Sequence, residues 1–205
     1  MSFFESKYLG KMDFEKAFDL QKNLWEKAKS NRMNSVIGLE HPAVITLGRR
    51  ASESEVHMQN QNLIPIVNAS RGGLATLHSE GQLVIYPIIQ LSQFKLGVRD
   101  YVHLLLEVTE KVFLKLNLKT YKDDLNIGLY TENGKIAFCG LEIKNGISLH
   151  GISINISNDL NLFKNIKSCG FDTMDLDRLN NYRTDVAPSN FYSLWVDEFN
   201  ALLKK

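Results

Sequence analysis

LNIGLYTENGKIAFCGLEIKNGISLHGISINI, residues 125–156, is the stretch that decides the fold. It carries two Asn-Gly dipeptides, Asn133-Gly134 and Asn145-Gly146, between runs rich in β-branched and other apolar residues. Asn and Gly tolerate the positive φ angles of a type I′ turn, which joins neighbouring antiparallel strands. The sequence therefore predicts a three-stranded antiparallel meander.

On the N-terminal side of the meander, helical and extended patterns alternate. Apolar residues recur at helical spacing after Asp13, which can cap a helix ending near Asn31, and again over residues 101–116. Short apolar runs bounded by Gly, Pro or Asn predict strands between these helices. One run is almost continuously apolar and is expected to be covered on both faces, with Pro87 at its end or at a bulge. The runs are residues 36–39, 44–47, 63–67 and 82–91.

On the C-terminal side, a short helix is expected around residues 159–163, and the polar residues 175–185 are expected to be irregular. A closing helix follows Pro188, with apolar residues at helical spacing. Its predicted buried face is Phe191, Leu194, Trp195, Phe199 and Leu202. Helices at both ends and in the middle, around many antiparallel strands, indicate an α+β fold.

Composition narrows the protein class. The 205 residues, 44% of them hydrophobic, can bury one substantial core, so we expect a single domain over residues 1–205. A net charge of +1 provides no general attraction to nucleic acid or to an anionic membrane. No window approaches transmembrane length, and the mixed charges of the first residues are unlike a signal peptide. Two cysteines are too few for a disulfide scaffold, so a cytosolic location is expected.

Three segments combine glycine with polar or ionisable groups and are the candidates for chemistry. They are RGGLATLHSEGQ at 71–82, NGKIAFCG at 133–140 and HGISINISNDLNLFKNIKSCG at 150–170. The chain has no Walker-type loop, no Gly-x-Gly-x-x-Gly and no Cys-x-x-Cys pair. Nucleotide-phosphate and zinc sites therefore lose their usual sequence support.

Each of these residues also has an ordinary structural interpretation. Arg71-Gly72-Gly73 could be a simple turn, or a loop whose glycines let a ligand lie against the main chain while Arg71 orders the loop or meets an anion. His78, on the strand that follows, could be structural or could line a pocket.

The lysine and the two cysteines are open to the same question. Lys135 could be a solvated turn residue, and Cys139 a small buried apolar residue. Cys169 lies between Ser168 and Gly170, where a thiol could be reactive. Residue chemistry alone favours Cys169 over Cys139 only modestly.

Taken in order and with their spacing, these segments resemble the lipoyl(octanoyl) transferase family over most of the chain. The ordered set is specific, although no single piece is diagnostic. It comprises EHPAVITLGRRAS at 40–52, Arg71-Gly72-Gly73 with Thr76, His78, Gly81 and Gln82, Lys135-Ile136-Ala137 with Gly140, His150-Gly151 with Asn155, Asp159-Leu160, Phe163, and Cys169-Gly170.

The resemblance implies the fold of the biotin and lipoate protein ligases, with a mixed or antiparallel sheet flanked by helices. It implies Cys169 as the acyl-carrying nucleophile and Lys135 as its activating partner, with no cofactor and no metal. The acyl-binding residues that it implies are Arg71, Gly72, Gly73, Leu74, Ala75, Thr76, Leu77, His78, Phe138, Cys139, Gly140, Gly151, Ile152 and Ser153.

The activity implied is transfer of an octanoyl group from octanoyl-acyl carrier protein to a lysine of lipoyl domains, in the cytoplasm. The implied acceptors are the lipoyl domains of 2-oxoacid dehydrogenase subunits and the glycine cleavage H protein. Two departures from the family pattern are Ser79-Glu80, where Gly-Pro is usual, and Ser168, where Pro is usual. The alternatives are an ATP-dependent lipoate protein ligase, a non-catalytic protein that binds the acyl carrier or the lipoyl domain, and a cysteine hydrolase using His78 or His150.

Overall fold

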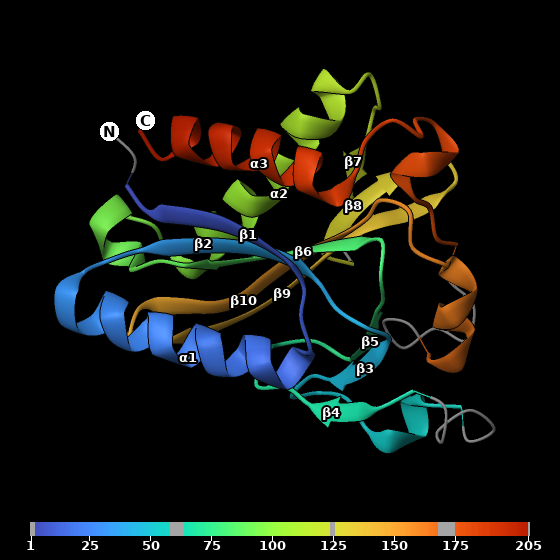
Figure 1. Ribbon diagram of the computed structural model, residues 1–205, viewed down its shortest axis with the longest axis horizontal. Coiled ribbons are helices and arrows are strands. Elements are labelled where there is room, and N and C mark those ends of the chain that lie inside the picture. Colours follow the sequence, from blue (N-terminus) through green and yellow to red (C-terminus); the bar gives the residue numbers. More distant parts are fainter. Residues whose placement is uncertain (1–2, 58–63, 124–125, 168–174, 205) are drawn as a thin grey trace.

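The computed structural model describes residues 3–57, 64–123, 126–167 and 175–204. Cys169, with the neighbouring Ser168 and Gly170, lies outside the described residues. The described part contains two sheets and three long helices, with the two chain ends on the same side of the molecule (Figure 1).

The larger sheet has seven strands in the order β1-β2-β6-β10-β9-β8-β7. β1 runs parallel to β2, and every other neighbouring pair is antiparallel, so the sheet is mixed as expected. The strands are β1 (Glu5–Lys11), β2 (Ser35–Glu40), β6 (Gln82–Ile88), β7 (Tyr121–Lys122), β8 (Gly128–Thr131), β9 (Gly134–Lys144) and β10 (Ile147–Asn155).

A smaller sheet has the order β4-β3-β5, with β3 parallel to β4 and antiparallel to β5. Its strands are β3 (Val44–Leu47), β4 (Ile66–Asn68) and β5 (Ala75–His78). It lies beside the N-terminal end of helix α1, at the lower right of Figure 1.

Helices cover both faces of the larger sheet. Helix α1 (Phe14–Asn31) packs on one face through Ala17, Trp25 and Ala28. Helices α2 (Val98–Lys115) and α3 (Pro188–Leu202) pack together on the other face (Figure 1). Every residue of β6 is therefore buried, as its continuous apolar run predicts. Among the helices that the structure describes, none is long and apolar enough to cross a membrane.

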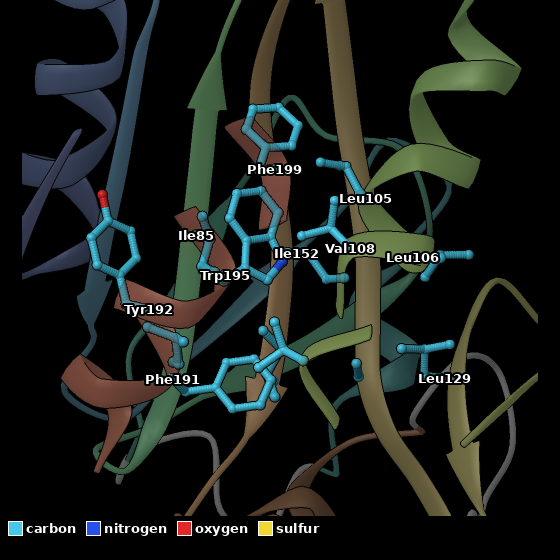
Figure 2. Packing of buried hydrophobic residues seen from close by; sticks show 14 of the residues in the cluster. Ile85, Leu105, Leu106, Val108, Leu129, Ile152, Phe191, Tyr192, Trp195 and Phe199 are labelled. Atoms are coloured by element: carbon cyan, nitrogen blue, oxygen red, sulfur yellow. The ribbon is translucent and has the colours of Figure 1, made fainter. Parts of the chain in front are cut away.

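The main core lies between the sheet and the helices α2 and α3. Figure 2 shows the indole of Trp195 at its centre, near Val108 of α2 and Ile85 and Ile152 of the sheet. The indole N–H donates to the Thr109 hydroxyl over 2.8 Å, so this buried donor has a hydrogen-bond partner. The predicted apolar face of the closing helix is confirmed for Phe191, Trp195 and Phe199, which are fully buried, whereas Leu194 and Leu202 are only partly buried.

The meander is confirmed, but only one of its two turns has the predicted type. Asn145 and Gly146 have φ angles of 52° and 75°, as a type I′ turn requires. At the first turn, Thr131 pairs with Gly134, so the connecting residues are Glu132 and Asn133, and neither has positive φ. Gly134 is instead needed for close packing, since a Cβ there would lie 2.4 Å from the carbonyl oxygen of Asp175.

The contact with Asp175 belongs to a short pairing that extends β9. Strand β10 pairs with β9 only from Ala137 onward, and Lys135 forms a parallel bridge with Leu176 instead. The Lys135 N–H donates to the Asp175 carbonyl over 2.8 Å, and the Asp177 N–H donates to the Lys135 carbonyl over 3.0 Å. Residues 175–177 thus occupy the place next to β9 that β10 leaves vacant.

The buried Asp177 side chain holds this segment in position. Its carboxylate accepts hydrogen bonds from the hydroxyls of Thr131 and Tyr182, the amide of Asn181 and the Arg178 N–H. Burial by itself would raise the pKa of Asp177, but these hydrogen bonds outweigh it and hold the pKa below its ordinary value. Asp177 therefore stabilises the fold in its ionised form.

We expect Asp177→Ala to lower the free energy of unfolding by about 3 kcal/mol, because several buried donors lose a charged acceptor. Urea unfolding at pH 7, followed by circular dichroism, measures this loss.

The isosteric variant Asp177→Asn tests the ionisation. Since the folded-state pKa is depressed, the contribution of the carboxylate is present above the unfolded pKa of about 3.9 and is lost as pH falls through the folded value. The difference in unfolding free energy between the native protein and Asp177→Asn should therefore narrow from pH 6 to pH 3. An equal difference at both pH values would contradict this role.

Candidate active site

A cavity opens where the smaller sheet meets the larger one. Its empty space, including the mouth that is open to solvent, is about 600 Å³. Strands β9 and β10 form one wall, the loop before β5 forms another, and Phe14 at the start of α1 closes one end. Most of the lining is apolar, so the cavity suits a hydrocarbon chain.

The structure brings together all but one of the described residues expected at the site. Leu77 is the exception, because side chains alternate along β5 and Leu77 points away from Thr76 and His78, into an apolar cluster with Ile45. The expected residues that line the cavity are Arg71, Gly72, Gly73, Leu74, Ala75, Thr76, His78, Lys135, Phe138, Cys139, Gly140, Gly151, Ile152 and Ser153.

Five further residues line the cavity and were not among the expected binding residues. Val84 and Tyr86 stand two apart on β6, so the period of a strand could have placed them on a common face. Phe14 was interpreted only as part of a helix core, and no sequence signal distinguished Ile127. The five are Phe14, Val84, Tyr86, Ile127 and His150.

The Arg71 guanidinium orders the loop that frames the cavity. It donates to the Thr46 carbonyl over 2.6 Å and to the Leu74 carbonyl over 2.9 Å, and it is 7% exposed. Gly73 has a φ of 91°, and the Gly72 N–H donates to the Leu141 carbonyl over 2.8 Å. Of the two roles open to Arg71 from sequence, these contacts show loop ordering.

Lys135 is buried at the cavity wall, with 1% of its surface exposed, so the solvated-turn interpretation is wrong. Its ammonium nitrogen lies 5.0 Å from the ring centre of Phe138 and 5.2 Å from that of Tyr130, within cation–π range. Gly128 makes room for the side chain, because a Cβ there would lie 2.4 Å from Lys135 Cε.

A β-bulge beside Lys135 contributes to its placement. Tyr130 pairs with Lys135, and the next pair is Leu129 with Ala137, so Ile136 has no partner in β8. Bulges bend a strand locally and redirect side chains, and they are common next to active sites. Both Lys135 and Ile136 are buried as a result.

Cys139 also lines the cavity, but its thiol is poorly suited to act as a nucleophile. Burial raises its pKa to about 12, although the charge of Lys135 acts in the opposite direction. At neutral pH the thiolate that carries out nucleophilic attack is therefore almost absent from Cys139.

An aromatic and histidine layer closes the inner end of the cavity. His150 lies over Phe18, with ring centres 5.2 Å apart, and His78 and His150 both stack on Phe14. Burial lowers the pKa of His78 and of His150 to about 3, helped by neighbouring positive charges. Both rings are therefore neutral at pH 7, and they extend the apolar lining.

A chain of buried hydrogen bonds joins this layer to Lys135. His78 Nδ1 lies 2.7 Å from Gln82 Oε1, Gln82 Nε2 donates to Asn155 Oδ1 over 2.9 Å, and Asn155 Nδ2 donates to the Asp177 carbonyl over 3.0 Å. Asp177 in turn bonds to the backbone of Lys135. Gln82 and Asn155, which belong to the family pattern in the sequence, thus connect His78 with the backbone segment that holds Lys135.

The charge introduced at Glu80 does not face the cavity. Its carboxylate pairs with Lys11 at 2.5 Å on the surface, and both side chains are more than half exposed. The loop keeps its sharp bend at Gly81, whose φ is 85° and whose N–H donates to Glu40 over 2.7 Å.

Comparisons with known proteins agree on a family. Residues 13–200 match the model of the lipoyl protein ligase A/B catalytic domain. An octanoyltransferase of Shewanella sp. (strain W3-18-1) is 34% identical over 170 residues, which are 83% of this chain and 77% of that protein. The octanoyltransferase of Shewanella halifaxensis is 32% identical over 170 residues, which again are 83% of this chain and 77% of that protein.

Solved structures show the same fold at lower identity. A lipoate-protein ligase A bound with ATP superposes with a TM-score of 0.79 at 15% identity, covering 100% of this chain and 86% of that chain. A biotin protein ligase from Aquifex aeolicus has a TM-score of 0.60 at 12% identity, covering 98% of this chain and 71% of that chain. The expected ligase-type α+β fold is confirmed, whereas the extent of a single domain over residues 1–205 stays a prediction.

The match to the family model and the identity to the octanoyltransferases decide the assignment. This chain belongs to the lipoyl protein ligase A/B catalytic-domain family and, within it, to the lipoyl(octanoyl) transferases, and it is an acyltransferase.

Proposed function

We propose that this protein transfers an octanoyl group from octanoyl-acyl carrier protein to a lysine of lipoyl domains, through a thioester on Cys169. The acceptors would be the lipoyl domains of 2-oxoacid dehydrogenase subunits and of the glycine cleavage H protein, in the cytoplasm. The observation that carries the proposal is a buried lysine, Lys135, in the wall of an apolar cavity built from the segments that the family pattern marks.

In the first half-reaction, the Cys169 thiolate attacks the octanoyl carbonyl, and the bond to the carrier sulfur breaks, so the carrier leaves as a thiolate. A free cysteine with a pKa of about 8.5 is only a few per cent ionised at neutral pH. An ammonium nearby stabilises the thiolate, and Lys135 supplies the charge.

In the second half-reaction, the amine of the acceptor lysine attacks the thioester carbonyl, an amide bond forms, and Cys169 leaves as a thiolate. The attacking amine must lose a proton, which Lys135 can accept once its ammonium has given its own proton to the departing carrier thiolate. The thioester is already activated, so the chemistry requires no ATP.

The cavity provides binding energy for the acyl chain. Burying most of an octanoyl tail at about 0.8 kcal/mol per methylene contributes on the order of 5 kcal/mol. A short acyl group gains only a fraction of this free energy. The apolar walls and the neutral His78 and His150 therefore support a preference for medium-length chains.

The acyl-enzyme is tested by the intact mass of the protein after mixing with octanoyl-acyl carrier protein without ATP. We expect a gain of one octanoyl group, absent in Cys169→Ala and retained in Cys139→Ala, because the Cys139 thiol is protonated at neutral pH. An adduct that survives Cys169→Ala and disappears in Cys139→Ala would move the nucleophile to Cys139. A requirement for ATP would favour a ligase.

The role of Lys135 is tested with Lys135→Met, which keeps the length and removes the charge. We expect the apparent pKa for acyl-enzyme formation to rise by about one unit or more, because the thiolate loses a neighbouring cation. Iodoacetamide reaction rates and acylation rates between pH 5 and 10 measure the shift.

Lys135→Arg separates the two roles of the lysine. A guanidinium keeps the charge but does not lose its proton, so acylation should persist while transfer to the acceptor slows by about 100-fold or more. The acyl-enzyme would then accumulate in the mass spectrum. Equal slowing of both half-reactions, with unchanged thermal stability, would argue against Lys135 as the base.

A further inference from the structure

A second hollow adjoins the acyl cavity on its outer side. It shares Lys135, Cys139 and Gly140 with the inner cavity, so the two spaces meet at the proposed reaction centre. Its empty space is about 1440 Å³ including the part open to solvent. With an octanoyl tail in the inner cavity, as proposed above, the thioester end of the donor would lie next to this outer hollow.

One wall of the outer hollow is cationic. Arg49 and Arg50 stand on backbone that is fixed to the cavity loop, since their N–H groups donate to the carbonyls of Arg71 and Gly73 over 3.0 and 3.2 Å. Both side chains are exposed, and among the described residues neither guanidinium has a hydrogen-bond or ion-pair partner. No carboxylate is among the described residues that line the hollow.

The positive charge of this wall extends into the inner cavity. Arg49 contributes, after burial and Arg71, to the lowered pKa of His150. Two uncompensated guanidinium groups beside a reaction centre favour an anionic group on the substrate, and arginine matches the geometry of a phosphate.

Another part of the lining of the outer hollow is apolar and open to solvent. Val98 is 54% exposed and Ile127 is 53% exposed, and Val102 lines the same side. Large apolar side chains that remain this exposed beside a cavity are typical of a ligand-binding surface. The hollow therefore combines an anion-binding wall with an apolar wall along one path to Lys135.

We infer that the outer hollow binds the phosphopantetheine arm of the acyl donor, with Arg49 and Arg50 holding its phosphate and the apolar wall contacting the pantetheine. This inference rests on the proposed function. The donor carries its acyl chain at one end, then the thioester, and the phosphate at the other end. This order matches the apolar inner cavity, the region around Lys135 and the cationic wall of the outer hollow.

The test compares two small donors, S-octanoyl-4′-phosphopantetheine and S-octanoyl-pantetheine, which differ only in the phosphate. For the native protein we expect kcat/KM for acyl-enzyme formation to be roughly tenfold higher with the phosphorylated donor, and this ratio to fall as salt is raised. In the double variant Arg49→Gln/Arg50→Gln the ratio should fall toward one.

Two control variants make the result specific. Arg32→Gln removes an exposed arginine at the end of α1, away from both cavities, and should keep the native ratio. Ile127→Ser alters the apolar wall and should reduce kcat/KM for both donors alike, again leaving the ratio unchanged. A native ratio near one, or a ratio that Arg49→Gln/Arg50→Gln does not change, overturns the inference while the proposed function stands.

Failure of the proposed function gives a different result. If octanoyl-acyl carrier protein and both small donors all fail to acylate the protein, the proposed function is wrong, and titration of free 4′-phosphopantetheine by calorimetry decides the inference separately. Binding that is weakened at least tenfold by Arg49→Gln/Arg50→Gln supports it, and absence of binding overturns it. Arginine-dependent binding of ATP, together with ATP-dependent activation of octanoate, would assign the cationic wall to a nucleotide and also overturn it.

Discussion

The pairing of residues 175–177 with the backbone of Lys135 is the contact on which the geometry of the site depends. Strand β10 ends at Asn155 and leaves the adjacent edge of β9 without a neighbour, in a part of the molecule from which water is excluded. Buried peptide groups must be hydrogen-bonded, so a returning segment has to fill that place. Asp175, the first residue of this pairing, follows Cys169 by six residues in sequence.

Several buried polar side chains hold the cavity walls in position. Asp177, Asn155 and Gln82 form one connected set of hydrogen bonds, and Arg71 is likewise used to fix a loop. A fully satisfied buried network rigidifies its surroundings, whereas a partly satisfied one is costly. The frame leaves an apolar inner space that shares Lys135 and Gly140 with an outer hollow lined by Arg49 and Arg50.

Much of the fold follows from local pattern. The three long helices and the meander were predictable because their apolar spacing is regular, and β6 because both of its faces are apolar. β1 was not predicted, since ESKYLGK is mostly polar and pairs on one side only, at the edge of the sheet. The type I′ prediction failed at Asn133-Gly134 because packing against Asp175, rather than turn geometry, requires the glycine. Leu77, which the family pattern includes with its neighbours, lies on the opposite face of β5 from Thr76 and His78 and does not line the cavity.

The sequence by itself determined the α+β class, the family pattern and the choice of segments that gather at the site, because these depend on residue type and spacing along the chain. Tertiary structure alone decided that Lys135 is buried, that burial raises the pKa of Cys139 and that Arg71 orders the cavity loop, because burial, pKa and hydrogen-bond partners depend on residues distant in sequence. It also decided that Arg49 and Arg50 line one hollow together with the apolar Val98 and Ile127. These residues belong to separate elements, and only the packing of α2 and the cavity loop around β9 brings them to a common space.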